Sequence, residues 1–258
     1  MKSDFDIEAK KIEKMIKIKN IIKKFPLDIF IINKNNISYE NQIFIDYMGV
    51  EMLLVSSGKI PARPLAALIK RLSDFIISLL LIILLAPFML AIMLLIKLES
   101  PGPAIYKQNR NGINGKVFTM YKFRSMYLHE SEQLKQASRG DKRISWIGSI
   151  IRRSSLDELP QLFNVLLGDM SLVGPRPHAS EHNIYYEVLI DSYMLRHKVR
   201  PGMTGLAQIN GLRGETKELK LMEDRVKYDL KYIDEWSLLL DLKILLATPI
   251  SLLKNESF

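Results

Sequence analysis

Hydrophobic and polar positions divide the chain into three parts with different patterns. Residues 1–60 combine a basic stretch with short apolar runs typical of strands, of which 28–32 and 42–45 are the clearest. An uninterrupted apolar segment follows at 75–96. The remainder of the chain alternates short strand and helix patterns with glycines and prolines. The sequence therefore predicts a mainly helical α+β protein with an appended N-terminal segment.

The N-terminal segment, residues 1–60, is followed by a domain over 61–258. Residues 10–24 alternate lysine with isoleucine and methionine, which predicts a helix, and Ser57 to Pro61 has the composition of a linker. Two interpretations of the strand-like runs stay open. They are the last strands of an α/β domain, or they belong to a basic adaptor without chemistry of its own.

The apolar segment at 75–96 carries no charge, and Ser78 is its one polar side chain. As a helix it extends about 33 Å, enough to cross a bilayer. Pro87 lies near its middle and predicts a kink or a break. Lysines and arginines flank the segment on both sides, and positive residues favour the cytoplasmic side of a membrane. A re-entrant hairpin over about 70–98, broken at Pro87, satisfies both flanks, with a kinked single span as the alternative.

Two adjacent carboxylates, Asp157 and Glu158, lie just before a predicted helix that ends at Gly168. A capping box with Ser155 as the N-cap places Pro160 inside the helix, where it removes a hydrogen bond. With Asp157 as the N-cap, Pro160 falls in the first turn, where a missing N–H costs nothing. Asp157 then lies at the positive end of the helix dipole, which suits phosphate chemistry. The pattern alone leaves a structural role and a functional role equally open.

Cationic side chains recur in the same part of the chain. The strand pattern at 117–126 places Lys122 and Arg124 on one face, about 7 Å apart. This spacing suits a diphosphate, although a solvated strand face explains it as well. Arg176 lies between two prolines, which stiffen its backbone and reduce the entropy lost when its guanidinium binds phosphate. The glycine-rich stretch after Arg200 contains further arginines and again indicates an anion.

Composition narrows the class of function. The formal net charge of +9 indicates an anionic partner: nucleic acid, an anionic membrane or a phosphorylated substrate. The basic loops around Arg176 and Arg200 have no interleaved aromatic side chains, so we expect no nucleic acid partner. The absence of cysteine excludes disulfides and cysteine metal sites. His178 and His182 have the spacing of zinc ligands, but no third ligand completes a recognised pattern.

From about residue 64 to residue 253, the chain resembles the bacterial sugar transferases, which are polyprenyl-phosphate glycosyl-1-phosphate transferases. The motifs that carry the resemblance are KRLSD at 70–74, SPGP at 100–103, KFRSM at 122–126, SLDELPQL at 155–162 and DMSLVGPRP at 169–177. They occur in one order over roughly three quarters of the chain.

The C-terminal part is most similar to the undecaprenyl-phosphate glucose phosphotransferase branch. That branch usually carries four membrane helices and a nucleotide-binding-like domain ahead of the catalytic part. We expect that these are missing here, and that residues 28–60 are the tail of that domain. Leu206 and Leu212 stand where the branch often has tryptophan, so the identity of the sugar stays open.

The resemblance implies a monotopic enzyme of the bacterial inner membrane, with a hairpin around Pro87, amphipathic interfacial helices and a cytoplasmic catalytic domain. The implied reaction moves a hexose-1-phosphate from a UDP-sugar, such as UDP-glucose or UDP-galactose, to undecaprenyl phosphate and releases UMP. This would initiate exopolysaccharide, capsule or O-antigen synthesis. Membrane lipids are expected partners, and a homo-oligomer is one alternative for the oligomeric state. The competing hypothesis is an inactive, truncated, membrane-anchored scaffold protein.

The resemblance also implies roles for individual residues. The first carboxylate of the Asp-Glu pair is the nucleophile in the family, which maps to Asp157 and implies a phospho-sugar intermediate on its side chain. Glu158 would help to hold Mg²⁺, with Asp157 as a second metal ligand. The side chains assigned to the substrate phosphates are Lys122, Arg124, Arg153, Arg176 and Arg200.

Overall fold

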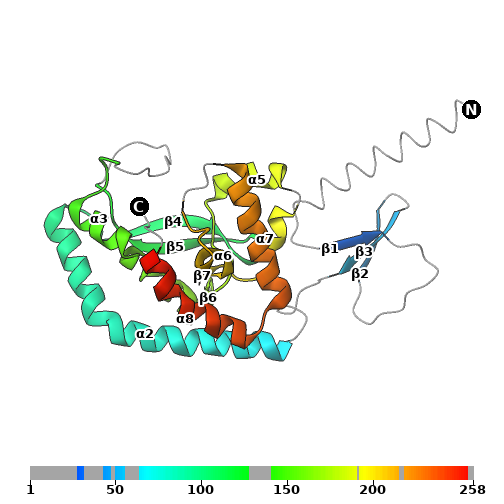
Figure 1. The fold of residues 1–258 in the computed structure, drawn as a ribbon, viewed down its shortest axis with the longest axis horizontal. Helices are drawn as coiled ribbons and strands as arrows, with labels where there is room; N and C mark the ends of the chain where they lie inside the picture. Colours follow the sequence, from blue (N-terminus) through cyan, green and yellow to red (C-terminus); the bar gives the residue numbers. More distant parts are fainter. Residues whose placement is uncertain are drawn as a thin grey trace, which may run out of the picture.

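The computed structural model describes the backbone of 28–31, 43–47 and 50–55, and then residues 64–127, 141–190, 192–214 and 218–254 (Figure 1). The predicted helix at 10–24 and the predicted linker at 57–61 lie outside the described residues. From Pro64 onward the helices and strands in chain order are α2 (Pro64–Glu99), β4 (Ile105–Asn111), η1 (Ile113–Gly115), β5 (Val117–Phe123), α3 (Trp146–Arg153), η2 (Leu156–Glu158), α4 (Gln161–Leu167), β6 (Ser171–Val173), α5 (Ser180–Leu189), η3 (Tyr193–Lys198), β7 (Gly202–Thr204), α6 (Leu206–Ile209), α7 (Leu219–Glu235) and α8 (Leu238–Lys254). The predicted mainly helical α+β class is confirmed.

The N-terminal segment contributes three strands, β1 (Asp28–Ile31), β2 (Ile43–Tyr47) and β3 (Val50–Val55). They form a sheet in the order β1-β3-β2, and both pairings are antiparallel. The predicted strands are therefore present. The parallel pairing of an α/β unit is not found among these three strands.

Helix α2 contains the whole apolar segment and is 36 residues long. Pro87 lies inside α2 and does not end it. Figure 1 shows that α2 bends along its length, from the cyan end towards the blue-green end. The helix is thus bent but continuous. The prediction that the helix breaks at Pro87 is therefore wrong. A proline removes one backbone hydrogen bond, and the turns on either side of it can continue the helix.

Most of the apolar part of α2 is not covered by the rest of the protein. It is the one helix among the described residues that is long and apolar enough to cross a membrane. Leu80, Ile83 and Leu84 are among its exposed side chains. An apolar surface of this extent is typical of a site that contacts lipid or protein.

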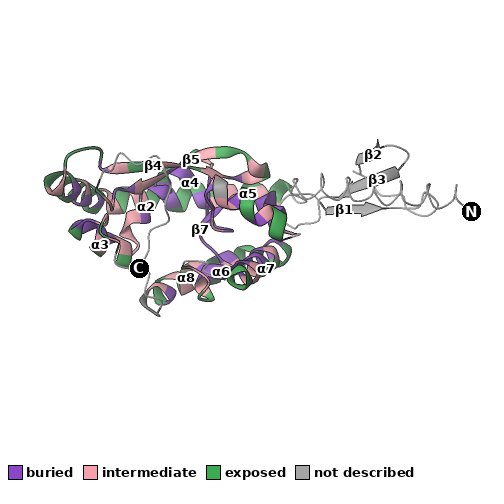
Figure 2. Cartoon of the chain, turned by 90° about the horizontal axis from the view of Figure 1, so that it is seen from above, coloured by how far each residue is buried: buried purple, intermediate pink, exposed green. Residues whose placement is uncertain are grey.

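The core of the domain joins the strands to the last helices. Met120 of β5, Val165 of α4, Val173 of β6, Ile233 of α7 and Ile244 of α8 are all buried in one cluster. Side chains of α2 between Ala66 and Leu85 pack against the same cluster. In Figure 2 the buried residues gather where these elements face one another, and exposed residues are frequent on α2 and α5.

The two short parallel strands β6 and β7 approach each other closely at their ends. A Cβ atom on Gly202 would lie 2.1 Å from the Gly174 nitrogen, so no larger residue fits there without moving the backbone. The Gly174 N–H donates to the Thr204 carbonyl at 2.9 Å, and the Gly202 N–H donates to the Pro175 carbonyl at 2.9 Å. This crossing fixes the backbone directly before Arg176.

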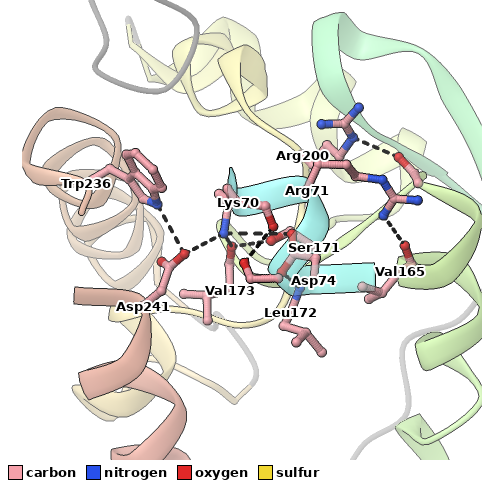
Figure 3. Close-up of polar contacts among 12 residues, drawn as sticks. Lys70, Arg71, Asp74, Val165, Ser171, Leu172, Val173, Arg200, Trp236 and Asp241 are labelled. Carbon is pink, nitrogen blue, oxygen red and sulfur yellow. Dashed lines mark hydrogen bonds and ion pairs between the residues drawn. The ribbon is translucent and has the colours of Figure 1, made fainter. Parts of the chain in front are cut away.

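A buried polar cluster connects α2 to β6 and α8 (Figure 3). The Lys70 ammonium donates to Asp241 Oδ2 at 2.7 Å and to the Val173 carbonyl at 3.1 Å. Tyr232 and Trp236 also donate to Asp241, at 2.8 and 3.1 Å. Asp241 therefore interrupts the apolar pattern of α8 because it binds groups from α2 and α7.

The C-terminal region forms two helices, α7 and α8. Trp236 lies between α7 and α8, and the Ser237 carbonyl accepts the Asp241 N–H at 3.0 Å in the first turn of α8. One side of α8 is buried, whereas Leu242, Leu246 and Ile250 form an exposed apolar stripe. Helix α8 thus packs on the core with one side and presents apolar side chains to the surface with the other.

Candidate active site

The two carboxylates lie in η2, a single 3₁₀ turn in front of α4. Helix α4 begins only at Gln161, because Pro160 has no N–H with which an α-helix could continue. Ser155 has a left-handed backbone with φ of 57° and forms no side-chain cap. The capping box and the alternative with Asp157 as the N-cap are therefore both wrong. The predicted end at Gly168 is confirmed, and its φ of 97° is the left-handed conformation that glycine permits.

The η2 turn packs against the second half of α2. Leu156 and Leu159, on either side of the carboxylates, contact a buried cluster that includes Met89, Ile92 and Ile96 of α2. The Asp-Glu pair is thus held next to the apolar helix, so any chemistry at the pair takes place beside it.

Glu158 is buried and lies among three cations. Its Oε1 accepts from the Lys122 ammonium at 3.0 Å, and its Oε2 accepts from Arg176 Nη1 at 3.1 Å. Arg176 Nη2 also donates to Oε1, so the guanidinium binds both carboxylate oxygens. Arg213 Nη2 forms an ion pair with Oε2 at 3.5 Å. Burial raises the pKa of Glu158, but the charges of Arg176 and Lys122 outweigh burial and hold this pKa well below its usual range.

Asp157 has a different environment. It is half-buried, and its carboxylate has no hydrogen bond to any part of the chain that the structure describes. Burial raises the pKa of Asp157 above its usual value, the charge of Lys122 lowers it, and the neighbouring Glu158 raises it. Arg152 lies close enough to lower this pKa as well. Of the two carboxylates, Asp157 is therefore the one whose oxygens are not already engaged.

The structure brings Lys122 and Arg176 to the pair, but it engages Arg124 and Arg200 elsewhere. Arg124 is buried and donates to the Ser100 and Pro101 carbonyls, both at 2.7 Å, after the end of α2. Arg200 Nε donates to the Gly168 carbonyl at 2.8 Å, after the end of α4. These two guanidiniums thus cap helix ends. Arg153 is exposed in the last turn of α3.

Two cations near the pair, Arg152 and Arg213, were not assigned from the sequence. Arg213 lies 55 positions from Glu158 along the chain, and the pattern there indicates only an anion in general. Arg152 directly precedes Arg153, and helical geometry rather than spacing decides which of the two faces Asp157. No local sequence pattern therefore predicts that Arg152 or Arg213 lies near the carboxylates.

The donor set around the pair can be compared with what Mg²⁺ requires. Mg²⁺ usually takes one or two carboxylates and completes its shell with substrate phosphates and waters. Asp157 fits this set, because its oxygens carry no hydrogen bond within the described residues. Both oxygens of Glu158 are held by cations, so Glu158 fits only if one of these contacts gives way. His178, the first of the two histidines with the spacing of zinc ligands, is buried, and its Nδ1 lies 2.6 Å from the Tyr193 hydroxyl. This nitrogen is therefore already engaged within the protein.

Comparison with known proteins identifies the family. Residues 65–255 match the model of the family described as bacterial sugar transferase. The chain is 52% identical over 190 residues to the UDP-glucose:undecaprenyl-phosphate glucose-1-phosphate transferase of Xanthomonas campestris pv. campestris, covering 73% of this chain and 39% of that protein. It is 49% identical over 210 residues to the protein of the same name from Caulobacter vibrioides, covering 81% and 79%.

A third relative is the exopolysaccharide production protein PSS of Rhizobium leguminosarum bv. phaseoli, 47% identical over 188 residues, covering 71% of this chain and 94% of the relative. The match covers about two fifths of the Xanthomonas relative, but most of the Caulobacter and Rhizobium relatives. The motifs that surround Asp157 and Arg176 lie inside residues 65–255, which the family model matches. The chain belongs to the bacterial sugar transferase family.

Proposed function

We propose that the protein transfers glucose 1-phosphate from UDP-glucose to undecaprenyl phosphate and releases UMP, which would initiate exopolysaccharide synthesis. The observation that carries the proposal is the position of Asp157. Its carboxylate has no hydrogen bond within the described residues, lies at the edge of a cation cluster and belongs to a turn that packs on an apolar helix. Both substrates are phosphates and one is a lipid. The names of the Xanthomonas and Caulobacter relatives support this choice of substrates.

The charges around the pair favour an anionic substrate. Lys122, Arg176 and Arg213 contact Glu158, and Arg152 lies near Asp157. Four cations thus face two carboxylates, which leaves an excess of positive charge for a diphosphate. Cations placed in advance stabilise the charge that develops on phosphate oxygens during transfer.

The proposed reaction has two steps. In the first step a carboxylate oxygen of Asp157 attacks the phosphorus that carries the sugar, and the bond from this phosphorus to the bridging oxygen breaks. UMP leaves with the bonding electrons, and the sugar phosphate stays on Asp157 as an acyl phosphate. In the second step an oxygen of undecaprenyl phosphate attacks the same phosphorus, and the Asp157 carboxylate leaves. No proton transfer is needed in either step, because both nucleophiles are anions.

Mg²⁺, when bound, would neutralise charge on the substrate phosphates. Asp157 is the residue that would hold it, together with the phosphates themselves. Glu158 has another part in this arrangement: it keeps Lys122, Arg176 and Arg213 in one place. A buried carboxylate between three cations reduces their mutual repulsion before substrate arrives.

We also propose that α2 is re-entrant and that the catalytic domain lies on the cytoplasmic face of the inner membrane. Both flanks of α2 are basic, which favours one side of the membrane for both. Trp146 at the start of α3 is 71% exposed, and α8 has its exposed apolar stripe of Leu242, Leu246 and Ile250. Tryptophan and leucine on surface helices are typical of contact with the lipid interface.

The test is UMP release by membranes that contain the full chain, with a panel of UDP-sugars and undecaprenyl phosphate. We expect release with UDP-glucose and the appearance of labelled sugar in the lipid fraction. Asp157→Asn membranes serve as the matched control. Release that is equal in wild type and control, or absent with every UDP-sugar, would support the inactive scaffold hypothesis instead.

A further inference from the structure

The two arginines that contact Glu158 from separate loops are each held from behind by a second arginine. Arg176 follows β6, and Arg213 lies in the loop after α6. Both guanidiniums reach Glu158, and their separation sets where a substrate phosphate can fit between them. The residues that fix the backbones of these two loops therefore matter for the geometry of the site.

Arg196 holds the first of these loops. Its Nη2 donates to the Arg176 carbonyl at 2.7 Å. The same guanidinium binds Asp229 of α7, with Nη2 at 2.6 Å and Nε at 3.1 Å from Oδ2. Arg196 and Asp229 are each 2% exposed. Arg176 is thereby connected through Arg196 to a fixed position on α7.

Arg225 holds the second loop. It lies one helical turn before Asp229 on α7, and its Nη2 donates to the carbonyl of Gly214 at 2.8 Å. Gly214 directly follows Arg213. Arg225 is only 7% exposed, and its Nε has no hydrogen-bond partner in the described part of the chain. Burying a cation without a carboxylate in contact is costly, so this placement is not explained by the stability of the fold.

The imidazole of His178 lies between the two rear arginines. Arg196 Nη1 lies 2.5 Å from its Nδ1, and Arg225 Nη1 lies 3.4 Å from its Nε2. Since a guanidinium only donates, Nδ1 accepts from Arg196. In the neutral ring Nε2 then carries the proton, so the approach of Arg225 Nη1 to Nε2 is a packing contact and not a hydrogen bond. His178 therefore lies between Arg196 of η3 and Arg225 of α7.

We infer that Arg225 and Arg196 are positioning residues: α7 sets the distance between Arg176 and Arg213 by holding one loop through Arg196 and the other through Arg225. The inference rests on the proposed function, because it assigns the two front arginines to the substrate phosphates. Neither rear arginine touches the substrate. Their effect on the reaction passes through the arginine that each one holds.

Double-mutant cycles test this directly. The variants are Arg225→Met, Arg213→Lys and Arg176→Lys, alone and in pairs, as full chains in membranes with UDP-glucose and undecaprenyl phosphate. We expect Arg225→Met to lower kcat about 10- to 100-fold while KM changes much less, because a displaced group costs most in the transition state. Lys227→Met, an exposed substitution two residues further on α7, is the matched control and should leave kcat unchanged.

The cycles give a pattern that a merely structural role does not produce. With Arg213→Lys already present, Arg225→Met should add a further loss of less than about threefold, because the group on which it acts is already altered. With Arg176→Lys present, Arg225→Met should keep its full effect. Full effects in both backgrounds would overturn the inference, since Arg225 would then act on the substrate or on the fold.

Two measurements keep the test decisive. Thermal unfolding shows whether Arg225→Met is folded; where it is not, Arg225→Lys replaces it in the same cycle, and the same pattern is required. Wild-type chains that release no UMP would overturn the proposed function. The cycle is then scored on the affinity for inorganic pyrophosphate, which depends on the positions of the front arginines whatever the reaction is.

Discussion

Lys70 of α2 and Asp241 of α8 form a buried ion pair with 2.7 Å between Nζ and Oδ2, although 171 positions separate them in the sequence. Lys70 also donates to the carbonyl of Val173, three residues before Arg176. The pair therefore connects the apolar helix to the strand that leads into the site.

Replacing Lys70 with methionine should destabilise the domain. Asp241 would keep a buried charge without its cation, which costs about 3–5 kcal/mol of unfolding free energy. Chemical denaturation in detergent measures the change. Lys70→Met combined with Asp241→Leu should recover part of the loss, because Asp241 no longer carries an unpaired charge. The recovery is incomplete because Asp74, with Oδ2 3.9 Å from Lys70 Nζ, loses the same cation in both variants. An equal loss in the single and double variants would show that the pair itself is not the cause.

Asp157→Asn should abolish UMP release. A carboxamide is a poor nucleophile towards phosphorus, so we expect a loss on the order of several powers of ten. Incubation of wild-type protein with UDP-glucose alone should place a phospho-sugar mass on the peptide that contains Asp157, and mass spectrometry detects it. An adduct on Glu158 would reverse the two roles. UMP release that requires both substrates together would exclude the two-step reaction.

Glu158→Gln should reduce UMP release about 100-fold or more, because a neutral amide no longer holds Lys122, Arg176 and Arg213 together. Raised Mg²⁺ should not relieve this defect, since both Glu158 oxygens bind cations of the protein. Titration of Mg²⁺ against the initial rate measures the effect in variant and wild type. A defect that high Mg²⁺ relieves would make Glu158 a metal ligand after all.

Some features of the site could be predicted because their signals are local. The end of α4 at Gly168 depends on one glycine with a left-handed backbone, and the apolar run of α2 is visible in composition alone. Adjacent carboxylates and a doubly proline-flanked Arg176 also identify the site region without any knowledge of the fold.

Other features could not be predicted, because they depend on where strands and helices end. β5 ends at Phe123, so the alternation that places Lys122 and Arg124 on one face stops before Arg124. Arg124 instead caps the end of α2. Arg213 reaches Glu158 across 55 positions, a contact that only the folded chain creates.

Formation of the adduct should depend on pH through Asp157. Burial raises the pKa of Asp157, and the charge of Lys122 partly opposes this shift. Adduct formation should therefore be lost as the pH falls through a pKa that lies above the usual value for aspartate, about 3.9, because the carboxylate becomes protonated. Lys122→Met should move the midpoint to higher pH, because the cation that lowers this pKa is removed. Single-turnover adduct formation from UDP-glucose, without undecaprenyl phosphate, measures the midpoint without titration of the lipid phosphate. A midpoint that does not move in Lys122→Met would show that Lys122 is not coupled to the nucleophile.

Pro87 should control the topology of α2. In the re-entrant arrangement, a tag at residue 1 and a tag after Phe258 are both accessible only from the cytoplasmic side. Pro87→Leu restores the hydrogen bond to the Ile83 carbonyl and removes the reason for the bend, so the helix should straighten and favour a span. A straight α2 would carry one basic flank across the membrane and pull Met89 to Ile96 away from Leu156 and Leu159. UMP release should therefore fall together with the change in labelling. Leu84→Ala, at an exposed position of α2, is the control that should alter neither. If Pro87→Leu left labelling and UMP release unchanged, the bend would have to come from the packing of α2 on the domain.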